Sequence, residues 1–295
     1  MKIGYPCINL SLDCRASRTF RMKSFSEERL LETVRGNLSC LEKIIDYNIE
    51  NELFFLRITS DLIPFASHKI NGFNWQAEFS DRFREIGEKI KKNNFRITMH
   101  PGQYTVLNSD KEKVFEKAIK ELDYHADVLD LLGMDIDAKI NIHVGGVYGD
   151  KKASIKRFID KYRSLPEKIK RRLVIENDEK SYSATDCLKI AEKAGIPITF
   201  DNLHHNINNN GEDLGNLLQE VFKTWKKEDG LPIVHYSSQK PGEREGRHVN
   251  HMDEDHFKGF LKDMNGFEFD LILEVKDKER SAKKALKIIK DKKNE

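Results

Sequence analysis

Cysteine is scarce in this sequence of 295 residues, and the few cysteines follow no recognised spacing. No pair has the two intervening residues of a CxxC motif, and the density is far below that of a small secreted domain held together by disulfides. These absences exclude a disulfide-rich scaffold. We predict reduced thiols in a reducing compartment at all four positions, Cys7, Cys14, Cys40 and Cys187.

Long apolar runs and an excess of one charge are also missing. No apolar stretch approaches the ~20 residues that a membrane-spanning helix needs. The balance of 51 Lys and Arg against 49 Asp and Glu leaves a net charge of +2, which does not mark a strongly basic nucleic-acid-binding domain. Asp13, Arg15 and Arg18 come too early for the apolar centre of a secretion signal. We therefore expect a cytoplasmic protein that does not act at a membrane.

The composition is that of a globular protein, with 38% hydrophobic and 34% charged residues. Short apolar runs of strand length alternate eight times with segments of helical period. Parallel strands need a helical crossover each time, so this alternation predicts a (β/α)8 TIM barrel. No linker rich in Pro, Gly or Ser divides the chain, and we expect one domain over residues 1–295. The predicted strands are 2–5, 53–58, 96–99, 139–142, 173–175, 198–200, 232–234 and 269–273.

Helix start signals support this alternation. Ser24 and Glu27 have the spacing of a capping box before an apolar stripe, and Asp110 precedes another stripe. The Lys-rich run 276–293 is typical of a last helix with one solvated face. Its predicted core face consists of Ala282, Ala285, Leu286 and Ile289.

Polar residues follow the predicted strands at their carboxyl ends. Six consecutive strands each end on a side chain that can bind metal, and that end of a barrel is where barrel enzymes build their sites. A single His or Glu in such a place is more often a hydrogen-bonded rim residue, but six converging on one axis would bury uncompensated charge unless a cation were present. The six are His100, His143, Glu176, Asp201, His235 and Glu274.

The donor types indicate which metals fit. Imidazole mixed with carboxylate, without cysteine, suits Zn²⁺, Mn²⁺ or Fe²⁺. His204 and His248 add donors close to the six, which gives enough for two or three ions. Clusters of this kind are typical of phosphodiester hydrolysis, in which the ions activate water and stabilise the leaving oxygen.

Several segments together resemble the UV damage endonuclease family of DNA repair enzymes, and the resemblance runs through essentially the whole chain. The segments are IGYPCINLSL (3–12), RITSDLIPFASH (57–68), MHPGQY (99–104), IENDE (175–179), DNLHH (201–205) and VHYSS (234–238). No one segment suffices, but MHPGQY, IENDE and DNLHH in this order are specific. The resemblance implies a barrel that nicks duplex DNA immediately 5′ to cyclobutane pyrimidine dimers and 6-4 photoproducts, leaving a 3′-hydroxyl and a 5′-phosphate.

The resemblance also implies roles for individual residues. One Mn²⁺ ion would be held by His100, His143 and Glu176, and Glu176 would bridge to a second ion held by Asp201, His235 and Glu274. A third ion would take His204 and His248, and His68 would hydrogen-bond the phosphate in the transition state. Gln103 and Tyr104 would enter the helix opposite the lesion, and Tyr5 and Asn9 would line the side that receives the damaged bases. The expected partner is damaged double-stranded DNA, bound by a monomer.

Two positions depart from this pattern or leave it open. Family members carry a lysine, thought to be modified by CO₂ beside the metals, two residues before the histidine of the seventh strand, and here that residue is Ile233. Isoleucine cannot bind metal, so we expect no modified lysine. In GRHVNHMDEDH (246–256), His251 and His256 are close enough in sequence to replace His248 as the ligand.

Other functions remain open from sequence alone. An abasic-site endonuclease, or a metal-dependent sugar isomerase of the same barrel type, would also place His, Asp and Glu at strand ends. A protein that binds damaged DNA without cutting it is disfavoured, because so many ligands indicate reactive metal chemistry. The loop after the seventh strand carries Lys240, Arg244 and Arg247, which are candidates for phosphate contacts or for an ordinary solvated loop.

Overall fold

The computed structural model describes residues 1–294 and contains the predicted barrel. All of its sheet neighbours pair in parallel, and β1 also pairs with β8, so that the sheet closes. The fold predicted from the sequence is therefore confirmed, and each of the eight predicted strands overlaps an observed one. The strands are β1 (Ile3–Pro6), β2 (Phe55–Ile58), β3 (Arg96–Met99), β4 (Lys139–His143), β5 (Leu173–Glu176), β6 (Ile198–Asp201), β7 (Ile233–Tyr236) and β8 (Asp270–Leu273).

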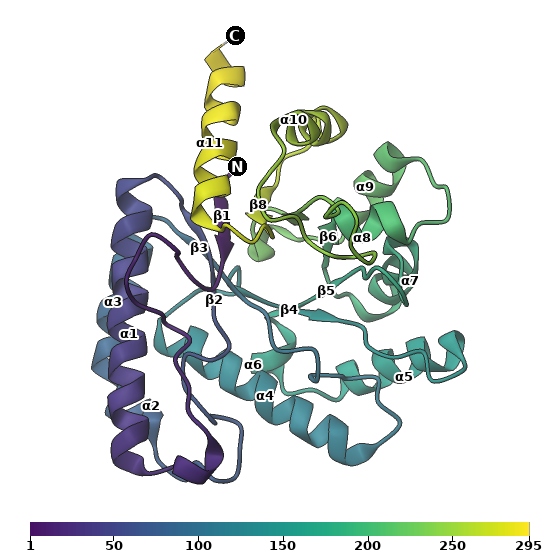
Figure 1. Ribbon diagram of the computed structural model, residues 1–295. Helices are drawn as coiled ribbons and strands as arrows, with labels where there is room; N and C mark the ends of the chain where they lie inside the picture. Colours follow the sequence, from purple (N-terminus) through teal and green to yellow (C-terminus); the bar gives the residue numbers. More distant parts are fainter. Residues whose placement is uncertain (295) are drawn as a thin grey trace.

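The helices surround the strands on all sides (Figure 1). Apolar helix faces pack against the outward-facing residues of the sheet and form the main core. The α-helices are α1 (Glu27–Glu50), α2 (Trp75–Glu78), α3 (Ser80–Lys92), α4 (Glu112–Leu131), α5 (Lys151–Arg163), α6 (Glu167–Lys170), α7 (Ala184–Ala194), α8 (Asn202–Ile207), α9 (Leu214–Lys223), α10 (Glu254–Asp263) and α11 (Glu279–Asn294); two short 3₁₀ helices are η1 (Met22–Ser24) and η2 (Lys227–Asp229). None of the helices in the described residues is long and apolar enough to span a membrane.

The inner face of the barrel carries several polar side chains. Side chains alternate along a strand, so in β4 the residues Lys139, Asn141 and His143 share one face while Ile140 and Ile142 share the other. Every residue of this strand except the partly buried His143 is buried. A buried polar side chain is costly unless it is paired, so Lys139, Asn141 and His143 need polar partners nearby.

Two helix starts differ from the prediction. The N-cap of α1 is Ser26, whose hydroxyl accepts a hydrogen bond from the Arg29 N–H at 3.2 Å. Ser24 instead ends η1, so the predicted capping box with Glu27 is wrong by two residues. In α4 the N-cap is Lys111, which makes no side-chain cap, and Asp110 is exposed. In α11, by contrast, the predicted core face holds, since Ala282 and Ala285 are buried and Leu286 and Ile289 pack against the core.

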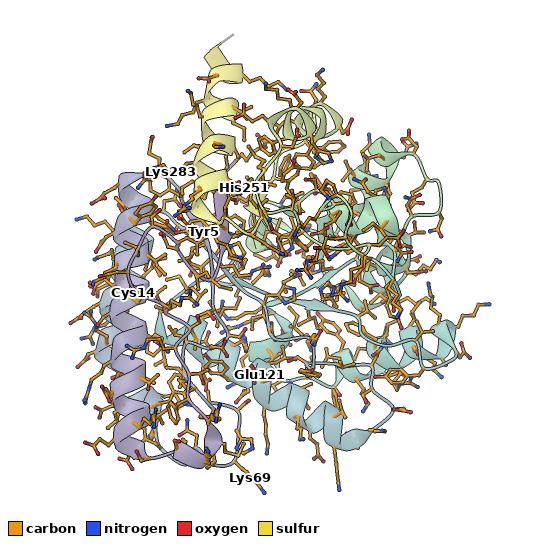
Figure 2. All side chains as sticks on the ribbon, viewed as in Figure 1. Tyr5, Cys14, Lys69, Glu121, His251 and Lys283 are labelled. Atoms are coloured by element: carbon orange, nitrogen blue, oxygen red, sulfur yellow. A yellow bond between two sulfur atoms is a disulfide. The ribbon has the colours of Figure 1, made fainter. Side chains whose placement is uncertain are left out.

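The prediction of four reduced thiols is wrong for one pair, because Cys14 and Cys40 form a disulfide. Cys14 lies in the loop after β1, and this loop runs alongside α1, which carries Cys40 (Figure 2). The two residues are 26 apart in sequence, and only the packing of the loop on the helix brings them together. Cys7 and Cys187 have free thiols, as predicted.

Candidate metal centre

The register of neighbouring strands aligns four of the predicted ligands at the carboxyl end of the barrel. His143 lies opposite Glu176 in the β4–β5 pair, and Asp201 lies opposite His235 in the β6–β7 pair. Because both pairs are parallel, all four side chains reach the same end of the barrel. The barrel itself therefore concentrates these ligand types in one place.

The first group of potential ligands consists of His100, His143 and Glu176. One ligand atom from each lies within 4.8 Å of the others. His100 Nε2 is 3.3 Å from Glu176 Oε2, and the two imidazole ring centroids are 5.3 Å apart. Asn141 Nδ2, on the same face of β4, donates a hydrogen bond to Glu176 Oε2 and fixes the carboxylate. The geometry suits one divalent ion.

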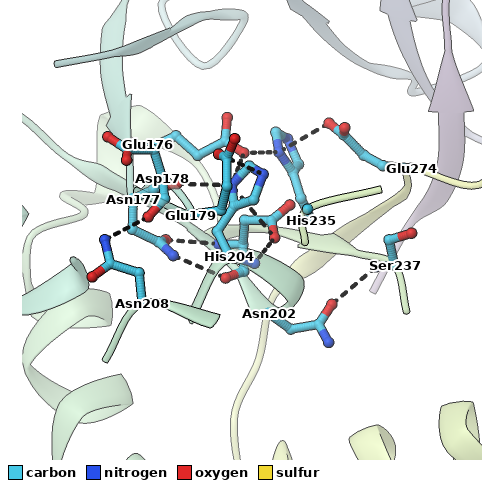
Figure 3. A network of polar contacts seen from close by, with 12 residues as sticks. Glu176, Asn177, Asp178, Glu179, Asn202, His204, Asn208, His235, Ser237 and Glu274 are labelled. Atoms are coloured by element: carbon cyan, nitrogen blue, oxygen red, sulfur yellow. Dashed lines mark hydrogen bonds and ion pairs between the residues drawn. The ribbon is translucent and has the colours of Figure 1, made fainter. Parts of the chain in front are cut away.

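The second group consists of Glu176, Asp201 and His235, again with ligand atoms within 4.8 Å of one another. His235 Nδ1 lies between two carboxylates, 3.0 Å from Glu176 Oε1 and 3.2 Å from Glu274 Oε1 (Figure 3). Glu176 is thus common to both groups, with one oxygen facing each. This is the arrangement expected of a carboxylate that bridges two ions, and metal binding itself stays a prediction.

His204 and His248 lie beside this double group. Asp201 caps α8 by accepting the His204 N–H at 2.8 Å, which places the imidazole so that its Nδ1 is 3.6 Å from Glu176 Oε1. The ring centroids of His204 and His248 are 6.2 Å apart, and His248 Nδ1 is 2.5 Å from the Glu274 carbonyl oxygen. The two residues therefore border a possible third ion position.

The other two histidines of the 246–256 segment lie elsewhere. His251 is exposed and contacts Asp277 Oδ2 at 3.0 Å. His256 is on α10, where its Nδ1 is 2.8 Å from the Tyr236 hydroxyl. Of the three candidates that sequence spacing left open, His248 is the one that borders the cluster.

The charges of the cluster fit a bound cation. Within the described residues, His143 Nδ1 and Asp201 Oδ2 are buried ligand atoms without a hydrogen-bond partner. Burial opposes ionisation of Glu176, yet the neighbouring His235 and His143 hold its pKa well below its usual range. Burial also opposes protonation of His204, but the nearby Asp201 and Glu176 carboxylates raise its pKa to about 9. Protonated imidazoles thus offset the negative charge of the carboxylates. Divalent ions that bind here would displace these protons and offset the same charge.

Arg57 is a part of the site that the sequence analysis missed. It is buried on β2, and its Nη1 is 2.6 Å from Glu274 Oε1. Arg57 and His235 both contact this oxygen of Glu274, so the carboxylate is held in place by two partners. A charged residue within the otherwise apolar segment 53–58 was the available signal, because a buried arginine requires an acidic partner.

Ile233 lies two residues before His235 on the same face of β7 and is buried. It belongs to a small apolar cluster with Phe55, Val174 and Ile272. An apolar layer thus replaces the lysine expected from the family pattern. The side chain at position 233 therefore offers no ligand to the candidate metal centre.

The predicted damage reader is exposed at the rim of the barrel. Gln103 and Tyr104 follow His100 in the loop after β3, and Tyr104 is 84% exposed. Pro101 is buried, so the loop is anchored at its base while its tip extends into solvent. An exposed, anchored phenol is available to stack on a base.

Tyr5 and Asn9, which were predicted to line the side that receives damaged bases, are buried. Their side chains are 0% and 2% exposed, and Asn9 Nδ2 donates to the Tyr5 hydroxyl at 2.8 Å. The same hydroxyl donates to Asn48 Oδ1 in α1 at 2.6 Å. Through these hydrogen bonds they connect the loop after β1 to α1.

A second rim aromatic was not found from sequence. Tyr104 and Tyr148 are the exposed aromatic side chains of the described residues. Tyr148 follows β4 and lines a cavity of about 500 Å³ together with His100, His143 and Gln103. Arg157 lies over the Tyr148 ring, 5.3 Å from its centroid. The glycines of the segment GGVYG, residues 145–149, were the signal for such an exposed turn.

The fold and the cluster together define a TIM barrel with a candidate metal centre of histidines and carboxylates at its mouth. The sequence matches the family described as UV-endonuclease UvdE over residues 1–294. The UV DNA damage endonuclease of Clostridium perfringens (strain 13 / Type A) is 43% identical over 293 residues, which cover 99% of this chain and 71% of that protein. The chain belongs to the UvdE family.

Solved structures agree with this placement. The crystal structure of SacUVDE matches with a TM-score of 0.94 and 48% identity, over 99% of this chain and 98% of that one. D-psicose 3-epimerase from Clostridium cellulolyticum H10 matches with a TM-score of 0.56 at 14% identity, over 84% of this chain and 91% of that one. The epimerase likeness concerns the fold alone.

Proposed function

We propose that this protein is a metal-dependent DNA repair endonuclease that acts on UV-damaged duplex DNA. The observation that carries the proposal is the pair of ligand groups sharing Glu176 at the barrel mouth, in a chain of the UvdE family. We further propose incision immediately 5′ to cyclobutane pyrimidine dimers and 6-4 photoproducts, with a 3′-hydroxyl and a 5′-phosphate as products. The sugar isomerase alternative has support from the fold alone.

The proposed ions are two or three Mn²⁺, with Zn²⁺ or Fe²⁺ as alternatives suited to the same donors. Bound ions would supply Lewis-acid activation of water and of the phosphodiester. His100, His143 and Glu176 would hold the first ion, and Asp201, His235 and Glu274 would complete the second around Glu176. His204 and His248 would hold the third.

One hydrogen bond of His68 supports its role as a phosphate donor. It is half-buried in the loop after β2, and its Nδ1 accepts the Ile70 N–H at 3.1 Å. In the neutral ring that bond puts the proton on Nε2, which is then free to donate to a phosphate oxygen. We propose that His68 stabilises the charge that develops on the phosphate.

Gln103 and Tyr104 are proposed to read damage by entering the duplex opposite the lesion. A planar phenol replaces lost stacking, and a distorted site has a lower unstacking cost. Tyr5 and Asn9 would reach the lesion only after their mutual hydrogen bond opens. We propose that residues 1–295 act as one domain and as a monomer. A cytoplasmic location stays a proposal, and the Cys14–Cys40 disulfide does not support it.

The test is incision of end-labelled duplexes that each carry one defined photoproduct. We expect a nick immediately 5′ to the lesion in Mn²⁺ and none in chelator, with a 3′ end that a polymerase extends. An undamaged duplex and a duplex with one abasic site are the controls. Cutting of the abasic duplex alone would favour the abasic-site endonuclease, and cutting of neither damaged duplex would refute the proposal.

A further inference from the structure

A separate cavity of about 400 Å³ adjoins the metal centre, and we call it the basic pocket. Its wall contains Arg57, Glu274 and His248 from the edge of the cluster. The loops after β7 and β8 contribute Arg244, Arg247, Lys276 and Lys278, and the end of β1 contributes Pro6 and Cys7. Five cationic side chains therefore surround one carboxylate.

The cations of the basic pocket are largely uncompensated. Glu274 is paired with Arg57 at 2.6 Å. In the described part of the chain, the other four cations make no ion pair. Arg57 is 6% exposed, and its Nε is a buried donor without a partner; Arg247 Nε is a second such donor. Unpaired buried donors are costly, so these groups indicate an anionic ligand that accepts from them.

The walls of the basic pocket are held together by main-chain hydrogen bonds. Within the β7 loop, the Lys240 N–H donates to the Arg247 carbonyl at 2.7 Å, and Gln239 pairs with His248 as a β-bridge. The Lys276 N–H of the β8 loop donates to the Val249 carbonyl at 3.2 Å. The two loops are thus tied to each other, so the main chain that carries the cations is in place before any ligand arrives.

We propose that the basic pocket binds a backbone phosphate of the DNA strand that is cleaved, namely the phosphate adjacent to the one at the metal centre. Glu274 borders both the metal centre and the basic pocket. A DNA strand with one phosphate at the metal centre therefore brings its neighbouring phosphate to the basic pocket. Arginine and lysine at such a pocket fit a phosphodiester oxygen, which accepts charge-assisted hydrogen bonds. This inference rests on the proposed endonuclease function.

The first test removes two charges from the basic pocket. In the Arg247→Gln/Lys278→Gln variant, we expect affinity for a photoproduct duplex to fall about tenfold to hundredfold, as for lost bonds to a charged group. The magnitude of the slope of log affinity against log salt should fall by roughly one to two. With fewer phosphate contacts, formation of the complex releases fewer counterions from the DNA. The matched control, Lys258→Gln/Lys262→Gln, removes the same charge from exposed positions on α10 and should leave both values close to wild type.

The second test replaces single phosphates by neutral methylphosphonates along the lesion strand. We expect one position next to the incision site to weaken wild-type binding, and the same replacement to have no further effect on the pocket variant. The inference would be overturned if both proteins were equally sensitive to the replacement at every position, or if the pocket variant behaved like the α10 control. In either case, incision by the wild type would leave the proposed function standing. A wild type that neither binds nor cuts the photoproduct duplex would overturn both.

Discussion

Glu176→Gln should abolish incision and leave the fold intact. The substitution keeps the side-chain volume but removes the charge that both ligand groups share, so both ion positions weaken together. The remaining amide also disturbs the contacts with His100 and His235, which lie 3.3 Å and 3.0 Å from the two carboxylate oxygens. We expect single-turnover incision to fall by several orders of magnitude, measured in saturating Mn²⁺.

The control for Glu176→Gln is Glu192→Gln, which makes the same chemical change at an exposed position on α7. It should incise like the wild type. Circular dichroism and urea unfolding should show the same folded barrel for both variants. Near-normal turnover by Glu176→Gln would contradict the assignment of this carboxylate as a shared ligand.

The second large effect is expected at the rim. Gln103→Ala/Tyr104→Ala should lose most of the preference for damaged over intact duplex and keep its metal content. Stacking on an aromatic side chain contributes roughly 1–3 kcal/mol per base, so the affinity ratio should fall about tenfold to hundredfold. The measurement is binding to matched duplexes with and without one photoproduct, together with metal analysis of the purified variant.

Leu231→Ala serves as the comparison for the rim variant. Leu231 is an exposed apolar residue just before β7, at the opposite end of the barrel from the metal centre. Its substitution should leave damage preference unchanged. If the rim variant keeps its preference as well, the damage reader lies elsewhere, and Tyr148, the other exposed rim aromatic, becomes the first position to test.

The barrel and its ligands could be predicted because each depends on local sequence. Short apolar runs specify the strands, and the polar residue that ends each run, such as His143 or Asp201, is carried to the mouth by parallel pairing alone. The exact helix start at Ser26 could not be predicted, since several nearby residues are able to cap a helix. Which of them does so depends on the backbone conformation of the preceding segment.

Other features depend on contacts between distant segments. The burial of Tyr5 depends on Asn48, which lies 43 residues away on α1, and the Cys14–Cys40 disulfide depends on the same packing of a loop against that helix. The ion pair of Arg57 with Glu274 joins residues 217 apart. No spacing rule connects such pairs, so Arg57 was not predicted as part of the site, and nothing in the sequence identifies Glu274 as its partner.

The most direct test of the central claim is a crystal structure grown with Mn²⁺ and measured at the manganese absorption edge. We predict two anomalous peaks, one among His100, His143 and Glu176 and the other among Glu176, Asp201 and His235, with Glu176 contacting both. A third peak would lie between His204 and His248, and no ligand would come from position 233. A single peak, or peaks that leave Glu176 without a metal contact, would contradict a metal centre organised around this shared carboxylate.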